Sequence, residues 1–264
     1  SGSCPNFCWL GDSAANRSVS EPRTTGSSAA GSTQDPESPY QSDGQSAFAG
    51  ALLLGAGFGR RFGSDKRLAA LGSRSVAEQT VARYRQIFAN VRVVIRAEDT
   101  ELRERLAPSA ELVVAHQARL GMGHSLAAGV KELGWTWVFI GLLDMPLIRD
   151  TSLQTLLAKA QHCKAQVIRP RHVSQPLAAN SDAADSSAIS IASIDPTPGH
   201  YFGHPIGWHN STFQALRTLT GDQGARDILR RGEFTETIID LDDPGLIFDI
   251  DRPDQLREIE RGMK

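Results

Sequence analysis

The stretch Ala51-Leu52-Leu53-Leu54-Gly55-Ala56-Gly57-Phe58-Gly59-Arg60-Arg61-Phe62-Gly63-Ser64-Asp65-Lys66 decides the fold of this 264-residue chain. Its short apolar run predicts a strand over residues 49–54 that is buried on both faces and ends at a glycine-rich turn. The turn and the residue after it carry four cations and one acid, namely Arg60, Arg61, Lys66, Arg67 and Asp65. Because glycines let backbone amides surround a phosphate and cations neutralise its charge, this loop predicts a nucleoside triphosphate site.

The glycine loop departs from two familiar phosphate-binding motifs. A P-loop would continue with Gly-Lys-Ser/Thr at a fixed spacing, and this loop does not. A dinucleotide-binding loop would have a third glycine where Arg60 follows Gly55 and Gly57. A solvated basic turn is the alternative, but such a turn needs neither so many glycines nor so many cations.

The composition is that of a globular chain with only local positive charge. With 40% hydrophobic and 22% charged residues, the chain can bury one substantial core or two small ones. A formal net charge of -2 disfavours nucleic acid as a partner, and three cysteines are too few for a disulfide framework. No apolar run reaches the roughly 18 residues that a bilayer-spanning helix needs. We expect a soluble cytoplasmic protein with neither a nucleic-acid nor a membrane partner.

Two segments lack the periodicity of regular structure. Residues 1–46 are rich in Ser, Gly, Ala, Asp and Pro, and we expect a disordered tail because they cannot bury enough apolar area. Residues 173–198 interrupt the later pattern with Ser, Ala and Asp, so we expect an inserted loop there. Residues 47–264 are expected to form the folded domain.

Strands and helices alternate along the expected domain. Strands are expected over residues 49–54, 91–95, 111–115, 137–142, 165–168, 235–240 and 245–250. Helices are expected over residues 75–89, 100–106 and 224–231, from near residue 125 and after residue 253, with capping boxes at Ser75, Thr151 and Ser211. The alternation predicts an α/β fold with a parallel sheet covered on both faces, whose ligand-binding loops follow the carboxyl ends of the strands.

A carboxylate closes the apolar strand that ends in Gly141-Leu142-Leu143-Asp144-Met145-Pro146. From the carboxyl end of a strand, Asp144 can reach Mg²⁺ that bridges phosphates. A lone Asp at a strand end is more often a helix cap or turn former. Its combination with Arg61 and Lys66 favours the metal role.

A second glycine-rich segment, Gly121-Met122-Gly123-His124-Ser125, begins a predicted helix. Free amides at a helix start, with Ser125 as a cap, can hold a base edge or a ribose. An ordinary glycine turn with a serine cap is the alternative.

The first glycine loop resembles the signature of a nucleotidyltransferase family, which reads Leu-Ala-Ala-Gly, variable positions, Arg, an apolar residue, Gly and a downstream Lys. The matching residues are Leu54, Ala56, Gly57, Gly59, Arg61, Gly63 and Lys66, while Gly55 replaces the first alanine. The resemblance implies a three-layer α/β/α, Rossmann-like nucleotidyltransferase fold with a mostly parallel sheet. In the family, an aspartate followed by an apolar residue and proline binds the metal, which corresponds to Asp144. The family's Gly-Met-Gly-x-Ser-Leu segment contacts the nucleotide, which implies this role for Gly123 and Ser125.

Two later motifs resemble the molybdenum cofactor cytidylyltransferase branch of this family. They are Gly203-His204-Pro205-Ile206-Gly207 and Gly221-Asp222-Gln223-Gly224-Ala225-Arg226. A neutral histidine can donate to a phosphate or pterin, and an arginine can bind a phosphate bidentately, so His204 and Arg226 are candidate acceptor-binding residues. A satisfied core histidine and a solvated helix charge are the alternatives.

The segment Phe248-Asp249-Ile250-Asp251-Arg252-Pro253-Asp254 resembles the family's closing Asp-Ile-Asp-Thr-Pro motif. In a strand, Asp249 and Asp251 would lie on one face and could both point at one metal. Arg252 replaces the usual threonine, so the following helix is expected to lack a side-chain cap. Which of the two aspartates supplements Asp144 stays open.

The resemblance covers residues 49–256 and implies transfer of CMP from CTP to the terminal phosphate of molybdopterin, with release of pyrophosphate. Its implied catalytic residues are Arg61, Lys66 and Asp144, its implied cofactor is Mg²⁺ on Asp144 with Asp249 or Asp251, and a molybdoenzyme or its chaperone would receive the product. The implied nucleotide-binding residues are Leu54, Gly55, Ala56, Gly57, Gly59, Gly63, Gly123 and Ser125.

Three functions stay open at this point. The first is transfer of CMP from CTP to molybdopterin. Ala56 favours cytidine over guanosine, because guanylyl-transferring relatives tend to have two glycines there, but Gly55 fits neither pattern. The second function is guanylyl or other nucleotidyl transfer to a different phosphorylated acceptor, such as a sugar phosphate. The third is a nucleotide- or cofactor-binding module without turnover.

Overall fold

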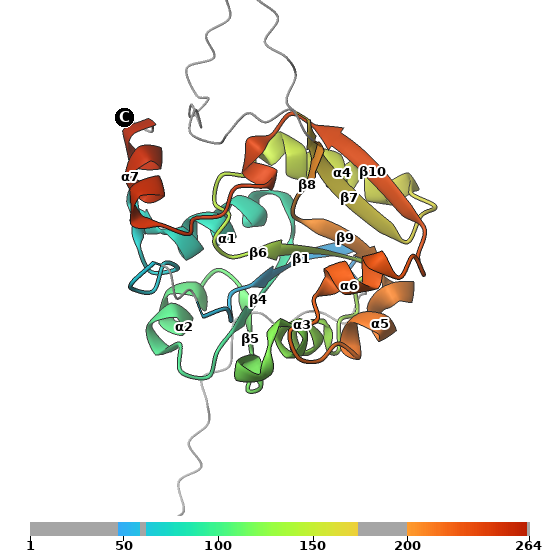
Figure 1. Ribbon diagram of the computed structural model, residues 1–264, viewed down its shortest axis with the longest axis horizontal. Coiled ribbons are helices and arrows are strands. Elements are labelled where there is room, and N and C mark those ends of the chain that lie inside the picture. Colours follow the sequence, from blue (N-terminus) through green and yellow to red (C-terminus); the bar gives the residue numbers. More distant parts are fainter. Residues whose placement is uncertain (1–46, 59–61, 174–199, 263–264) are drawn as a thin grey trace, which may run out of the picture. The chain divides into compact units, whose positions relative to one another are not determined.

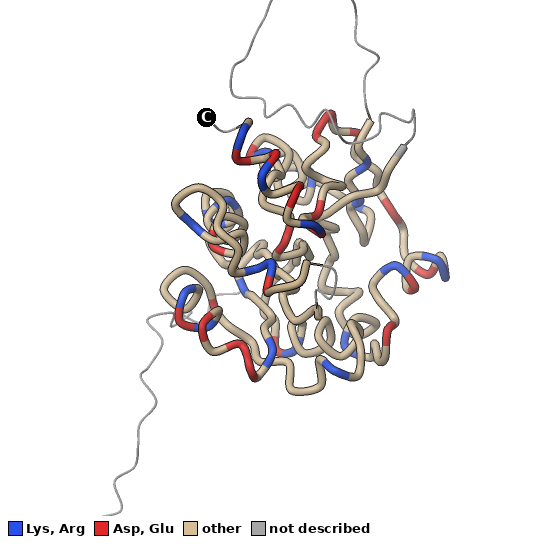
Figure 2. The backbone as a smooth tube through the Cα atoms, turned by 60° about the vertical axis from the view of Figure 1, so that its left-hand side comes forward, with Lys and Arg blue, Asp and Glu red and all other residues tan. Residues whose placement is uncertain are grey.

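A computed structural model describes residues 47–58, 62–173 and 200–262 of the chain, all of which belong to the compact unit 40–264. The expected tail, residues 1–46, and all but the first residue of the expected insert, 173–198, lie outside the described residues. Gly59 and Arg61 lie outside them as well. Basic and acidic residues are interspersed along the backbone of this unit (Figure 2).

The unit is built on an eight-stranded, mostly parallel sheet in the order β10-β7-β9-β6-β1-β4-β5, with β8 paired to β7 (Figure 1). Only β8 and β9 run antiparallel to their neighbours within this sheet. The strands are β1 (Ala49–Leu54), β4 (Asn90–Ile95), β5 (Glu111–Val114), β6 (Trp137–Leu142), β7 (Val167–Val173), β8 (His200–Phe202), β9 (Ile206–His209) and β10 (Glu236–Leu241). A separate two-stranded sheet joins β2 (Ala70–Leu71) to β3 (Arg74–Ser75).

Helices cover both faces of the large sheet. The helices of the described residues are α1 (Val76–Ile87), α2 (Thr100–Leu106), α3 (Met122–Val130), α4 (Asp150–His162), α5 (Phe213–Arg217), α6 (Ala225–Arg230) and α7 (Pro253–Gly262). Leu53 packs in one core cluster with residues of α1, α2 and α4, whereas its neighbour Leu52 packs in another with residues of α3, α5 and α6. Because successive strand residues point to opposite faces, β1 is buried on both sides. The expected three-layer α/β/α fold is confirmed.

The expected strand over residues 245–250 is wrong. Pro244–Leu246 instead form a short 3₁₀ helix, and the chain then runs without strand pairing. The carboxylate of Asp243 organises this turn: it accepts from the Gly245 N–H at 2.9 Å and from the Ser152 hydroxyl at 2.7 Å. A side chain at Gly245 would meet the Leu147 carbonyl oxygen at 2.3 Å. The segment therefore packs against the start of α4 rather than extending the sheet.

Of the three expected capping boxes, the one at Ser75 is confirmed and those at Thr151 and Ser211 are wrong. Ser75 and Glu78 exchange the two hydrogen bonds of a capping box at the start of α1, as expected. At α4 the first helical residue is Asp150, so the box expected at Thr151 does not form. The box expected at Ser211 is wrong too, because a 3₁₀ turn capped by His209 precedes α5.

The last helix begins at Pro253 as expected, but its first turn has a hydrogen-bond partner that sequence reasoning missed. The side-chain oxygen of Gln255 accepts from the N–H groups of Asp251 and Arg252, at 2.9 and 2.8 Å. The Gln255 side chain therefore compensates for the side-chain cap that is lost where Arg252 replaces the usual threonine. In the described part of the chain, no helix is both long and apolar enough to cross a membrane.

Candidate active site

The carboxyl ends of β1, β4 and β6 meet at one edge of the sheet and open into a pocket. The strand pairing continues past the strand ends: Gly55 N–H donates to Val94 O at 2.9 Å, and Leu143 N–H donates to Leu54 O at 3.1 Å. The pocket has a volume of about 840 Å³. Lys66 and Asp144 both line it, together with five of the predicted nucleotide-binding residues, Leu54, Gly55, Ala56, Gly57 and Ser125.

Lys66 is the charged link between the glycine loop and the acids across the pocket. Its Nζ lies 2.6 Å from Asp144 Oδ2 and 2.7 Å from Asp251 Oδ1. Burial alone would lower the pKa of Lys66, but the two carboxylates outweigh burial and raise it. The ammonium therefore stays charged at neutral pH, and only 13% of the side chain is exposed.

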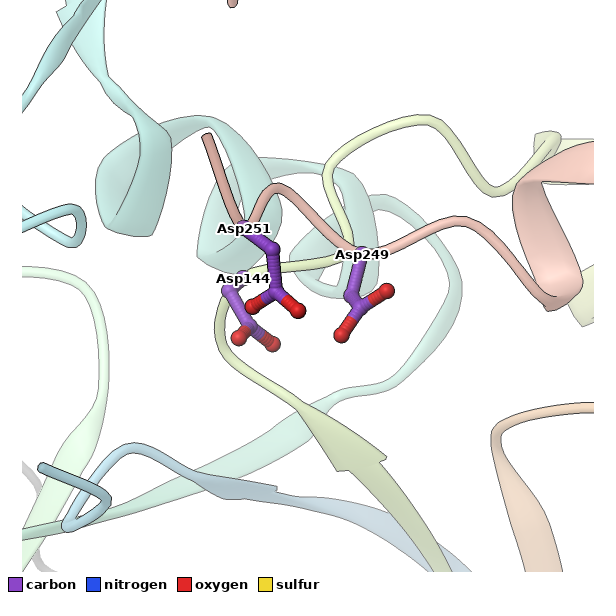
Figure 3. Close-up of side chains that lie close together, drawn as sticks. All are labelled: Asp144, Asp249 and Asp251. Carbon is purple, nitrogen blue, oxygen red and sulfur yellow. The ribbon is translucent and has the colours of Figure 1, made fainter. Parts of the chain in front are cut away.

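Three carboxylates converge beside Lys66. Ligand oxygens of Asp144, Asp249 and Asp251 all lie within 4.8 Å of one another, and Figure 3 shows the side chains turned toward a common space. Although residues 249–251 form no strand, Ile250 N–H donates to the Asp144 backbone oxygen at 3.1 Å and holds the segment against the end of β6. Both candidate partners of Asp144 are thus within reach of one cation.

The charge balance of this acidic cluster fits a divalent metal. Burial raises the pKa of Asp249, and repulsion from Asp251 and Asp144 raises it further. Lys66 alone therefore does not neutralise the three acids. Carboxylate oxygens are the ligands that Mg²⁺ and Mn²⁺ prefer, so the donor set suits the predicted cofactor.

The glycines of the predicted nucleotide site have different reasons for lacking a side chain. A Cβ at Gly55 would lie 2.5 Å from the end of the Leu143 side chain and 3.1 Å from Val94 O, so alanine there would require the Leu143 side chain to shift. Gly63 has a φ of +81°, which a side chain disfavours. At Gly57 a Cβ would meet none of the described atoms within 4 Å, although this glycine lines the pocket. Gly57 thus has no structural need to be glycine and is free to face a ligand.

The second glycine segment differs from its prediction in two respects. The helix α3 begins at Met122, so Ser125 lies inside its first turns and is no cap. Gly123 does not line the pocket; its N–H donates to Gly221 O at 2.9 Å, and a Cβ would meet the backbone of Thr220 at 2.8 Å. Close packing on the 220–223 turn accounts for this glycine, while Ser125 lines the pocket.

The predicted acceptor-binding residues, His204 and Arg226, lie outside the pocket lining. His204 Nδ1 lies 3.4 Å from the Ile140 backbone oxygen. Burial lowers the pKa of His204, while Asp144 opposes and Arg226 reinforces that effect. The imidazole is therefore neutral at pH 7. Arg226 is exposed and lies at the start of α6.

Sequence reasoning missed an aromatic and cationic group at the pocket. Two guanidinium groups lie over the Phe58 ring, with Arg96 Cζ at 4.9 Å and Arg119 Cζ at 5.7 Å from the ring centroid. All three residues line the pocket, and so does Asp222. One signal was available: Arg96 directly follows an expected strand, at the edge where such sheets bind ligands.

Comparison with known proteins agrees with this geometry. Residues 51–237 match the family described as the MobA-like NTP transferase domain. The purine catabolism protein PucB of Bacillus subtilis (strain 168) is 26% identical over 225 residues, which cover 80% of this chain and 96% of that protein.

Two solved structures illustrate the fold similarity. Rv0371c from Mycobacterium tuberculosis H37Rv, in complex with manganese, has a TM-score of 0.61 and 18% identity, covering 82% of this chain and 100% of that one. Molybdopterin-guanine dinucleotide biosynthesis protein A from Archaeoglobus fulgidus has a TM-score of 0.55 and 17% identity, covering 80% of this chain and 97% of that one. Since the family match extends over more than half of its length, this chain belongs to the MobA-like NTP transferase family of nucleotidyltransferases.

Proposed function

We propose that this nucleotidyltransferase moves CMP from CTP to the terminal phosphate of molybdopterin and releases pyrophosphate. The observation that carries the proposal is the contact of Lys66 Nζ with Asp144 at 2.6 Å, inside a pocket lined by residues 54–58 at the start of the glycine loop. A cation and a metal-binding acid at one point are what a triphosphate needs at the phosphorus that is attacked.

The proposed reaction needs no general base. The attacking group is a phosphate, which is already ionised at neutral pH. Lys66 stays charged because its pKa is raised, and it would bind the triphosphate together with Arg61. A divalent cation held by Asp144, Asp249 and Asp251 would neutralise charge on the transferring phosphate. The chain then contributes alignment and charge neutralisation, which carry most of the catalysis in phosphoryl transfer.

The acceptor and the base are the finer parts of the proposal. His204 and Arg226 are assigned to the acceptor on the resemblance of their motifs, and Asp144 and Arg226 act in opposite directions on the pKa of His204. Mg²⁺ is proposed as the metal; the manganese in the complex of Rv0371c supports a divalent ion of this kind. Recipients of the product are proposed to be a molybdoenzyme or its chaperone.

A second candidate is guanylyl transfer to the same kind of acceptor. The name of the similar archaeal protein points to guanine dinucleotide formation. Ala56 and the segment 221–226 favour cytidine instead, on the resemblance described above.

The test is pyrophosphate release by the purified protein with CTP, GTP, ATP and UTP, each with molybdopterin or a sugar phosphate and with or without Mg²⁺. Release with CTP and molybdopterin alone would support the proposal. Release with GTP would favour the second candidate, and release with a sugar phosphate would change the acceptor. Binding of nucleotide without release under any condition would leave a binding module and refute catalysis.

A further inference from the structure

Arg67, the residue after Lys66, is the only buried arginine or lysine among the described residues, with 4% of its surface exposed. Burying a charge is costly unless it is fully paired. Burial alone would lower the pKa of Arg67, but hydrogen bonds to Asp65 and Asp99 raise it above its ordinary value. The guanidinium is therefore a permanent charge inside the wall of the pocket.

Every N–H group of this guanidinium has an acceptor in the protein. Nε donates to Asp65 Oδ1 at 2.8 Å, and Nη2 donates to Asp65 Oδ2 at 2.5 Å and Asp99 Oδ1 at 2.6 Å. Nη1 donates to Asp99 Oδ2 at 2.7 Å and to the Gly55 backbone oxygen. Arginine has five N–H donors, so none is left over for a phosphate. A direct substrate contact is thus a poor explanation for Arg67, although it lines the pocket.

The bonds of Arg67 join segments that carry the parts of the proposed site. Gly55 directly follows β1 and begins the glycine loop, and Asp99 lies in the turn after β4. Asp99 also accepts from the backbone and side chain of Arg96, at 2.8 and 3.0 Å. The Arg67 backbone oxygen accepts from Ala77 N–H at 3.0 Å, at the start of α1. Arg67 therefore fixes the backbone next to Lys66 relative to β1, β4 and α1.

Stability alone is a weak reason for this arrangement. Buried ion pairs can often be replaced by apolar residues with no loss of stability, because desolvation offsets their attraction. What a fully bonded guanidinium adds is geometry, since five directed bonds allow one position.

We propose that Arg67 is a positioning residue that holds Lys66 and Gly55, at the start of the glycine loop, at the distance nucleotidyl transfer requires. The inference rests on the proposed function, because Lys66 is taken to act on the triphosphate. An error of about 1 Å in the position of a catalytic group can cost roughly 100-fold in rate.

The test compares Arg67→Lys with Arg92→Lys in the full chain. Arg92 is a matched control: it is largely buried, donates to Glu111 at 2.6 Å and to two backbone oxygens, and does not line the pocket. For Arg67→Lys we expect kcat per folded enzyme to fall at least about 30-fold, with KM for the nucleotide changed less than about 3-fold. For Arg92→Lys we expect unchanged kcat despite a comparable loss of thermal stability.

A second readout needs no turnover. Amide hydrogen exchange at residues 55–57 and 66–68 should become faster in Arg67→Lys and stay unchanged in Arg92→Lys. If Arg67→Lys does not fold, Asp99→Asn keeps the shape and weakens the same bonds, and should lower kcat in the same direction.

The outcomes separate the two proposals. Wild-type kcat in folded Arg67→Lys or Asp99→Asn, or unchanged exchange of the loop amides, would overturn the positioning role. A rise in KM at constant kcat would overturn it as well, because it would mark a direct substrate contact. If the wild type turns over no nucleotide while the exchange result holds, the proposed function fails and the structural part of the inference stands.

Discussion

Replacing Gly57 by alanine separates the needs of the fold from the needs of a ligand. A Cβ at this position meets none of the described atoms within 4 Å, and its φ lies outside the left-handed region. The protein itself therefore accepts alanine here. Gly57 also lines the pocket, so the added methyl group would project where a triphosphate is expected to approach the backbone.

The two effects have opposite signs. Alanine at a compatible position stabilises a protein by about 0.4–1 kcal/mol, because the unfolded chain has less freedom to lose. For a domain of this size, that corresponds to a rise in Tm of about 1–4 °C. If the methyl group displaces the bound phosphates by about 1 Å, kcat/KM should fall roughly 100-fold, equivalent to about 2.7 kcal/mol.

The assay measures Tm without ligand and kcat/KM for pyrophosphate release side by side. The control is Gly134→Ala, because a Cβ at Gly134 also meets nothing within 4 Å and this exposed residue does not line the pocket. Both variants should be at least as stable as the wild type, and only Gly57→Ala should lose activity. Full activity of Gly57→Ala would refute the placement of the triphosphate against this loop.

The remaining predictions concern the charged groups. Lys66→Ala should lower turnover at least about tenfold, because it removes a cation from the phosphate-binding end of the pocket; near-wild-type rates would exclude this residue from the mechanism. Asp144→Asn should weaken Mn²⁺ binding, followed by electron paramagnetic resonance without nucleotide, at least about tenfold. Asp249→Asn and Asp251→Asn, measured in the same way, decide which carboxylate supplements Asp144; wild-type affinity in all three variants would contradict a metal site here. Burial alone would raise the pKa of Asp99, but hydrogen bonds from Arg67 and Arg96 lower it to about 2. Its stabilising contribution is thus present above the ordinary pKa of 3.8 and is lost as pH falls through about 2. Chemical denaturation between pH 5 and 2 should then show that Asp99→Asn reduces this pH-dependent loss of stability by about 2 kcal/mol; an unchanged pH profile would contradict the lowered pKa.

The sequence predicted the fold well where the pattern of one segment was sufficient. The bounds of β1, β6 and α2 agree with the expected ranges, because apolar runs and a short charged amphipathic segment have strong local signals. The strand expected over residues 245–250 failed, because its turn depends on Asp243 contacting Ser152, about 90 positions away in the chain. Such a contact leaves no periodic signal.

The candidate site, too, was predictable where one sequence motif was sufficient and not where distant segments meet. The motifs around Lys66 and Asp144 indicated that the two residues belong together, and their side chains are in contact. The roles of Arg67 and Gly123 could not be predicted from the sequence. A charged residue in a basic loop is expected to be solvent-exposed, whereas Arg67 is buried and paired with acids from two different segments. A glycine at a helix start predicts a ligand contact, whereas Gly123 lacks a side chain because the 220–223 turn packs closely against it.

The charges around Lys66 suggest why one lysine can serve both the free and the substrate-bound enzyme. Three ionised carboxylates carry more negative charge than the one ammonium of Lys66 balances, and the raised pKa of Asp249 reflects its burial together with repulsion from Asp251 and Asp144. A divalent cation would balance the excess negative charge, and the attraction of Asp144 and Asp251 for Lys66 would weaken at the same time. The ammonium would then be free to turn toward the triphosphate while its backbone stays fixed beside Arg67. Lys66 and the metal would therefore compete for the carboxylates before the nucleotide binds and act together afterwards. Lys66→Ala should for this reason bind Mn²⁺ more tightly than the wild type in the absence of nucleotide, and weaker binding would show that the lysine does not compete with the metal.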